Sequence, residues 1–216
     1  MKIKLIIFDL DGTLVNSIAD ITNALNYAIE PYGFEQLTVE RTTSLVGEGV
    51  TRLIEKLLGL KAAALKDAVL KRFLDYYSEH LTDKTVPYPG VYETLEMLRN
   101  YRKAVISNKR EDLSRRLLES LGLSGYFDII WGSDSVSEKK PSPVPVLEML
   151  KKVSCGPAEA IIVGDSNYDI EAGRSAGVRT VAVSYGYRHI SLLKDADFII
   201  DNMKDLIYKL DLLNAN

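Results

Sequence analysis

Two aspartates near the start of the chain have the type and spacing of a metal and phosphate site. Asp9 and Asp11 follow the apolar run at 4–8 and precede Gly12. Residues two apart in an extended chain can point the same way, so the two carboxylates can lie together. Crowded carboxylates beside apolar residues are costly unless a cation neutralises them, and Mg²⁺ sites favour one or two carboxylates plus substrate phosphate. The alternative is an ordinary turn, for which Asp and Gly are well suited.

Further polar side chains follow apolar runs later in the chain. One group comes directly after the run at 103–106, a second lies in the sequence GDSNYD after the run at 160–163, and two lysines occupy the loop between them. If these runs are strands beside the first, their carboxyl ends meet at one edge of the sheet, where ligands bind. The candidates are Ser107, Asn108, Lys109, Lys139, Lys140, Asp165 and Asp169.

This set of side chains suits phosphoryl transfer. An aspartate can attack phosphorus and form an aspartyl-phosphate. The transferring group is densely negative, so it needs a cation and hydrogen-bond donors around its oxygens. A metal held by Asp9 and Asp165 supplies the first, and Ser107 with a lysine from the loop supplies the second. A second carboxylate, Asp11, can protonate the leaving oxygen and then take a proton from water.

The elements that must position these residues follow from the hydrophobic pattern. The run at 4–8 is β-branched and ends in Asp and Gly, which predicts a strand buried on both faces of a parallel sheet. From Pro87 onward strand and helix patterns alternate, which predicts right-handed βαβ units. We expect the first strand to lie centrally, between the strands that end at Ser107 and at Asp165.

Residues 16–83 show only helical patterns, of which the longest is AAALKDAVLKRFLDYYSEHL. The simplest description is an all-helical insertion into the α/β fold. The sequence therefore predicts a core made of residues 1–15 and 84–216 and a helical domain over residues 16–83.

Composition excludes several other classes of protein. The 216 residues are 46% hydrophobic and 26% charged with a net charge of −3, so there is no basic footprint for nucleic acid. The lone Cys155 excludes an internal disulfide and fits a reducing compartment. We see no run of apolar residues long enough for a membrane span and no signal-peptide pattern. We expect a cytoplasmic protein without nucleic-acid or membrane partners, and either a monomer or a homodimer.

Four motifs in order resemble those of the haloacid dehalogenase superfamily of phosphohydrolases: FDLDGT, SN, KPSP and GDSNYD. The insertion at 16–83 is similar in position to the helical cap of that family. The resemblance implies a three-layer, Rossmann-like α/β core with an inserted all-helical cap. Within the family the chain looks most like phosphoglycolate phosphatases, on the evidence of FDLDGTLVNS, VGEG, YPGVYETLEML, SNK and GDSNYDIEAGRSAG.

The resemblance implies a role for each motif residue. Asp9 would be nucleophile and metal ligand, and Asp11 the general acid and base with its backbone carbonyl on Mg²⁺. Asp165 would be a metal ligand, and Asp169 would hold the metal's water or the lysine. Lys140 matches the KPxP lysine that balances charge, with Lys139 as the alternative. The residues expected to bind the phosphoryl group are Gly12, Thr13, Ser107 and Asn108.

The implied function is a Mg²⁺-dependent phosphatase for a small phosphorylated metabolite, similar to phosphoglycolate, acting through an aspartyl-phosphate. The presence of Asp11 argues against dehalogenase chemistry. The alternatives are an inorganic pyrophosphatase, a sugar phosphatase or β-phosphoglucomutase of the same superfamily, and a non-catalytic phosphate-binding regulator. The cap segment Gly47, Glu48 and Gly49 is either a loop that faces the catalytic aspartates or a plain turn between helices. Candidates for binding a substrate carboxylate are Arg41, Arg52 and Arg110.

Overall fold

The computed structural model describes residues 2–215, apart from the side chain of Lys61. It divides into two compact units, which we describe separately. The first contains the chain up to Asn16 and from Pro87 onward, and the second is Ser17–Val86. None of the helices described is long and apolar enough to cross a membrane.

The first unit is built on a six-stranded parallel sheet with the order β5-β4-β1-β6-β7-β8. Its strands are β1 (Leu5–Phe8), β4 (Arg102–Ile106), β5 (Ile129–Trp131), β6 (Ala160–Gly164), β7 (Arg179–Val183) and β8 (Phe198–Ile200). The predicted central position of the first strand, between the strands that lead to Ser107 and Asp165, is confirmed. All four residues of β1 are at most 1% exposed, as a strand covered on both faces requires.

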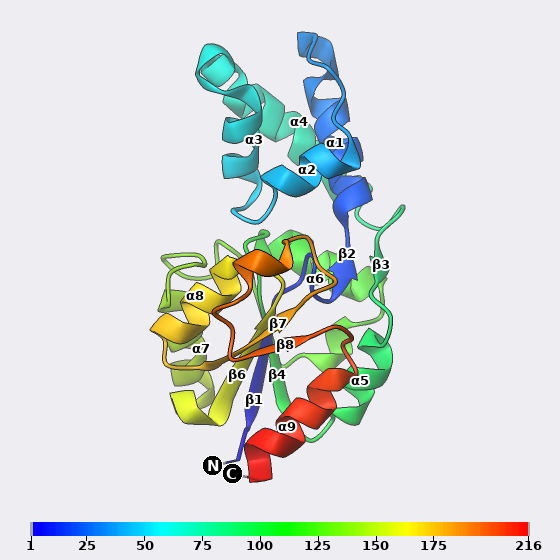
Figure 1. Ribbon diagram of the computed structural model, residues 1–216. Helices are drawn as coiled ribbons and strands as arrows, with labels where there is room; N and C mark the ends of the chain where they lie inside the picture. The colour runs from blue at the N-terminus through cyan, green and yellow to red at the C-terminus, as the bar shows by residue number, and fades with distance from the viewer. Residues whose placement is uncertain (1, 216) are drawn as a thin grey trace. The chain divides into compact units, whose positions relative to one another are not determined.

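Helices follow the strands and cover the sheet, with α7 and α8 on one side and α5 and α9 on the other (Figure 1). The helices of this unit are α5 (Val91–Met97), α6 (Glu111–Ser120), α7 (Val144–Val153), α8 (Asn167–Ser175) and α9 (Asp205–Ala215), with short 3₁₀ helices at Ser124–Tyr126, Pro157–Glu159 and Ile190–Leu192. Leu5 and Ile7 pack against Met149 of α7 and Ala172 of α8. Because side chains alternate along a strand, Ile6 and Phe8 point to the opposite face.

The second unit is helical. It contains α1 (Ile18–Ile29), α2 (Val39–Leu45), α3 (Val50–Leu58) and α4 (Lys66–Glu79), with 3₁₀ helices at Glu30–Tyr32 and Leu60–Leu65. The short strands β2 (Val15–Asn16) and β3 (Val86–Pro87) pair where the chain passes between the units. The predicted fold class, a parallel α/β core with an inserted helical domain, is confirmed.

Two polar side chains, one partly buried and one buried, link segments of the helical unit. Asn26 on α1 exchanges two hydrogen bonds with the backbone of Leu37. Asp20 is 1% exposed, and its Oδ2 accepts hydrogen bonds from the backbone N–H groups of Lys84 and Thr85 and from the Thr85 hydroxyl. The first and last segments of the unit are therefore fixed to each other.

Candidate active site

The predicted site residues of the first unit gather at the carboxyl ends of β4, β1 and β6. Phe8, the last residue of β1, is in register with Val105 of β4 and Val163 of β6. The three strands therefore end within two residues of one another, and the residues that follow them are brought to one edge of the sheet. Asp9, Ser107 and Asp165 occupy that edge.

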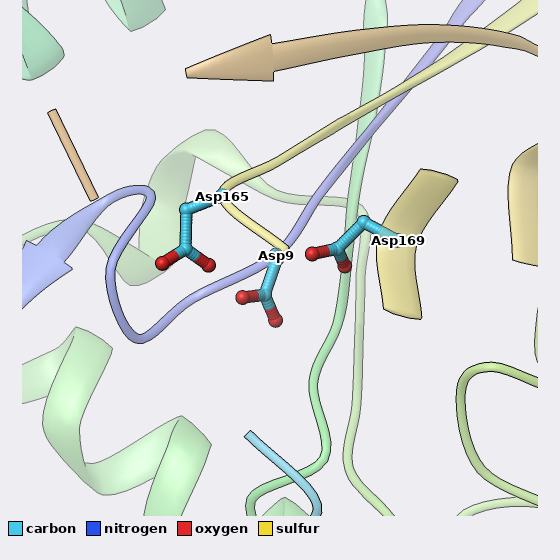
Figure 2. Close-up of side chains that lie close together, drawn as sticks. All are labelled: Asp9, Asp165 and Asp169. Carbon is cyan, nitrogen blue, oxygen red and sulfur yellow. The ribbon is translucent and has the colours of Figure 1, made fainter. Parts of the chain in front are cut away.

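Three buried carboxylates form the centre of this site. Asp9, Asp165 and Asp169 each offer one oxygen, and these oxygens lie within 4.8 Å of one another (Figure 2). Burial raises the pKa of Asp9 to about 7, with a smaller contribution from the negative charge of Asp169 and in spite of Lys140. Burial, together with the charges of Asp9 and Asp169, also raises the pKa of Asp165 well above its usual range.

Lys140 is the counter-charge inside this cluster. It is 2% exposed, and its Nζ donates to Asp9 Oδ1 at 2.8 Å, to Asp169 Oδ1 at 2.6 Å and to the Ile106 carbonyl at 2.6 Å. Burial disfavours its charge, but the two carboxylates more than offset this and hold its pKa above the ordinary lysine value. Lys139, left open by the sequence, is exposed. The structure thus brings Lys140, rather than Lys139, into contact with the acids.

Asp169 is held in place from both sides. Its Oδ2 accepts from the backbone N–H and the hydroxyl of Ser166, in a capping box that begins α8. Its Oδ1 accepts the hydrogen bond from the Lys140 ammonium. A Cβ on Gly164 would lie 2.1 Å from Asp169 Cγ, so the close approach of this side chain requires glycine at the end of β6.

The turn after β1 packs directly on Asp165. Gly12 has φ +91°, and a Cβ there would lie 2.3 Å from Asp165 Oδ2. The backbone N–H groups of Gly12 and Thr13 donate within the turn, to Val15 and Leu10. Thr13 is fully buried, and its hydroxyl has no hydrogen-bond partner among the described residues. Gly12 and Thr13 therefore shape the turn, and phosphate binding by either residue stays a prediction.

Ser107 and Asn108 lie at the same edge and are nearly buried. The Ser107 hydroxyl accepts the backbone N–H of Lys109 at 3.1 Å. Asn108 Nδ2 donates to the backbone carbonyl of Lys140 at 2.9 Å, which ties the segment after β4 to the lysine loop. Both residues are thus beside the acidic cluster, and Asn108 fixes the position of Lys140.

Two contacts of the site go beyond what the sequence predicts. The Lys109 ammonium contacts the carboxylate of Asp11. In the loop after β7, the backbone N–H of Tyr187 donates a hydrogen bond to Asp165 Oδ2 at 2.6 Å. The same loop packs closely on Asp165, because a Cβ on Gly186 would lie 2.2 Å from Asp165 Cβ. From the sequence, Tyr185 and Tyr187 are either residues that border the site or, as the favoured alternative, residues that pack within the loop after a predicted strand.

The remaining candidates belong to the helical unit or lie at the start of α6. Gly47, Glu48 and Gly49 form the loop between α2 and α3 in the helical unit, where Glu48 pairs with Arg52 and Lys56. Arg52 also pairs with Glu55 at 3.0 Å. Arg110 pairs with Asp112 at 3.0 Å, and Arg41 is exposed. Two of the three arginines proposed for a substrate carboxylate are thus engaged by neighbouring acids.

The donor set at the sheet edge fits a hard divalent cation. Three carboxylates within reach of one centre are the oxygen ligands that Mg²⁺ prefers. The raised pKa values of Asp9 and Asp165 reflect buried negative charge that Lys140 does not fully compensate. A cation placed among these oxygens would relieve that repulsion.

Comparisons with known proteins agree with this geometry. Residues 6–183 match the family model described as haloacid dehalogenase-like hydrolase. The phosphoglycolate phosphatase of Aquifex aeolicus is 40% identical over 210 residues, which cover 96% of this chain and 97% of that protein. The phosphoglycolate phosphatase of Chromobacterium violaceum is 40% identical over 211 residues, 94% of this chain and 95% of that protein.

A solved structure extends the agreement to three dimensions. The crystal structure of a predicted phosphoglycolate phosphatase from Haemophilus somnus has a TM-score of 0.92 and 32% identity, and the match covers 97% of this chain and 98% of that one. The resemblance inferred from the four motifs is therefore confirmed, as is the expectation of an enzyme similar to phosphoric monoester hydrolases.

Proposed function

The chain belongs to the haloacid dehalogenase-like hydrolase family, and on this premise we propose that it is a Mg²⁺-dependent phosphatase that forms an aspartyl-phosphate on Asp9. The observation that carries the proposal is the buried group of Asp9, Asp165 and Asp169 around Lys140. We propose phosphoglycolate, or a phosphomonoester of similar size, as the substrate, because relatives at 40% identity carry the name phosphoglycolate phosphatase.

In the proposed mechanism, Asp9 is the nucleophile. Its carboxylate attacks phosphorus, the bond from phosphorus to the ester oxygen breaks, and Asp11 gives its proton to the departing alcohol. Water then attacks the phosphorus of the aspartyl-phosphate and passes a proton to Asp11. The bond between phosphorus and the Asp9 oxygen breaks, so phosphate is released and the Asp9 carboxylate is restored. A bound Mg²⁺ would supply positive charge to the phosphoryl oxygens and to Asp9 and Asp165.

The other residues hold charge and geometry during both steps. Lys140 donates to Asp9 and Asp169 and keeps positive charge beside the nucleophile as negative charge moves to the phosphoryl group. The Ser107 hydroxyl is free to turn its proton toward a phosphoryl oxygen, since the contact it makes with the Lys109 N–H uses its oxygen. Asn108 keeps the Lys140 backbone in place.

The test of this function is phosphate release by the purified protein. With Mg²⁺ we expect phosphoglycolate to be the best substrate in a panel that includes pyrophosphate, β-glucose 1-phosphate and p-nitrophenyl phosphate. Removal of the metal with EDTA should stop turnover. A protein that binds phosphoglycolate but hydrolyses none of the panel would be a binding protein, and the proposal would be wrong.

Asp165→Asn is expected to have opposite effects on metal affinity and on the stability of the metal-free protein. The substitution removes a metal ligand, so Mg²⁺ affinity should fall by at least the roughly tenfold that loss of an outer-shell partner costs. It also removes a buried negative charge beside Asp9, so the metal-free variant should melt no lower than the wild type. Calorimetric titration with Mg²⁺ and thermal melts in EDTA measure the two effects. Unchanged Mg²⁺ affinity would remove Asp165 from the ligand set.

We propose further that residues 1–15 and 84–216 form the catalytic core and that residues 16–83 act as a cap that selects the substrate. The division into compact units near these boundaries supports this assignment. Gly47 and Gly49 have φ of +116° and +83°, a conformation that keeps their loop in a shape other residues strain to adopt. We propose that this loop helps to choose among phosphate esters.

The double variant Gly47→Ala, Gly49→Ala should have a kcat/KM for phosphoglycolate about tenfold lower than the wild type, which is in the range of a lost specificity contact. Its hydrolysis of p-nitrophenyl phosphate should change much less. Gly59→Ala is a matched control, because Gly59 is in the same unit, has φ +60° and has open space for a Cβ. Parallel kinetics on both esters measure the difference. Equal losses on the two esters, or the same shift in the control, would count against a role in selection.

A further inference from the structure

A second lysine, Lys109, lies against the proposed general acid. Its Nζ donates to both oxygens of the Asp11 carboxylate, at 2.6 Å and 2.8 Å. The side chains are only 7% and 20% exposed, respectively. This arrangement differs from an exposed ion pair, because the ammonium contacts both oxygens and is largely removed from water.

The backbone of Lys109 is fixed on two sides. Its N–H donates to the Ser107 hydroxyl at 3.1 Å, and its carbonyl accepts the N–H of Ser133 at 2.8 Å. The loop that carries Ser133 is seated tightly, since a Cβ on Gly132 would lie 2.0 Å from the backbone nitrogen of Glu111. The ammonium of Lys109 therefore extends from a part of the backbone that has little freedom to move.

The two lysines of the site contact different acids. Lys140 contacts Asp9 and Asp169, and Lys109 contacts Asp11. Asp9 and Asp11 are two positions apart directly after β1, so their two carboxylates are near neighbours. Repulsion between them would turn the Asp11 side chain away from the nucleophile unless a cation held it. Lys109 supplies that cation.

We propose that Lys109 is a positioning residue that holds the Asp11 carboxylate in the orientation needed for proton transfer to the departing alcohol. The inference rests on the proposed function, because it assumes that Asp11 carries this proton. Because Lys109 donates one hydrogen bond to each oxygen, the plane of the Asp11 carboxylate is fixed.

The proposal predicts a dependence on the leaving group. An alkyl alcohol such as that of phosphoglycolate leaves poorly without a proton, whereas p-nitrophenolate is stable as an anion. In Lys109→Met, first-turnover cleavage of phosphoglycolate should fall by about tenfold to a hundredfold, within the range of general acid catalysis. The first-turnover burst of p-nitrophenol should change by less than about threefold, far below that range. KM should stay near the wild-type value for both esters.

A double-mutant cycle shows whether Lys109 acts through Asp11. Lys109→Met should cost little in the Asp11→Asn background if the two side chains work as a unit. Lys109→Arg, which keeps the charge and can also contact both oxygens, should recover part of the rate on phosphoglycolate. Lys139→Met, which removes an exposed lysine, controls for the loss of one positive charge.

Each outcome decides the proposal. Equal losses on the two esters, additive losses in the cycle, or a rise in KM with unchanged first-turnover rate would overturn it. Melting temperatures of all variants separate these effects from loss of the fold, and the arginine variant provides a folded test if the methionine variant is unstable. If the wild type itself cleaves neither ester, the proposed function is wrong, and the role of Lys109 is wrong with it.

Discussion

Asp9→Asn is expected to lower turnover by at least about 10⁴-fold, as losses of catalytic nucleophiles do. An amide does not attack phosphorus usefully, and it gives the metal one negative charge fewer. The side chain keeps its volume and an oxygen that can accept the hydrogen bond from Lys140, now made to Asp9 Oδ1 at 2.8 Å. Steady-state phosphate release with saturating Mg²⁺ measures the loss.

The fold of this variant should be intact. Burial of the Asp9 carboxylate among other acids is unfavourable, as its raised pKa shows, so neutralising it should leave the metal-free protein at least as stable as the wild type. Thermal melting in EDTA provides that control. A variant that melts normally and keeps a substantial part of the wild-type rate would show that Asp9 is not the nucleophile.

Lys140→Met is expected to cost both stability and activity. The ammonium is 2% exposed, and its removal leaves the carboxylates of Asp9 and Asp169 buried without it. Breaking a buried ion pair on one side costs about 3–5 kcal/mol of unfolding free energy. Loss of one group that stabilises transition-state charge costs about 10²–10³-fold in kcat.

Urea unfolding in EDTA and steady-state kinetics measure these two losses. Added Mg²⁺ should restore part of the stability, because it binds the uncompensated carboxylates, but little of the activity. Lys139→Met is the matched control, since Lys139 is the adjacent lysine and is exposed. If the Lys139 variant lost as much activity as the Lys140 variant, the assignment of the buried lysine would be wrong.

The sequence alone was sufficient to predict those parts of the fold that a local pattern of residues determines. A short β-branched run that ends in Asp and Gly predicts a strand covered on both faces, and β1 lies in the interior of the sheet with Leu5–Phe8 buried. The alternation of strands and helices after Pro87 then determines the parallel topology, because crossovers are right-handed. The end of each strand in turn places Asp9, Ser107 and Asp165 together.

Helix boundaries were harder to predict from the hydrophobic pattern. The stretch AAALKDAVLKRFLDYYSEHL has helical periodicity throughout, yet its first part lies in a 3₁₀ helix that ends at Leu65, and α4 begins only at Lys66. Ala62 has non-helical φ and ψ of −119° and 18°. Hydrophobic periodicity does not distinguish the two kinds of helix over so few residues.

The contacts that refine the site join residues far apart in the chain. Lys109 and Asp11 are 98 positions apart, and Tyr187 and Asp165 are 22 apart. Neither pair has a spacing that a motif could show. The motif KPSP favours Lys140 over Lys139 in the sequence, and the structure adds that Lys140 is buried whereas Lys139 is exposed.

Trapping the covalent intermediate tests directly whether Asp9 carries an aspartyl-phosphate. The wild-type protein is mixed with phosphoglycolate and Mg²⁺, quenched within the first turnovers, reduced with borohydride and digested for mass spectrometry. Reduction of an aspartyl-phosphate gives homoserine, and we expect it at position 9 only, dependent on substrate and absent from the Asp9→Asn variant. Homoserine at another aspartate, or none at any position while phosphate is released, would contradict an aspartyl-phosphate on Asp9.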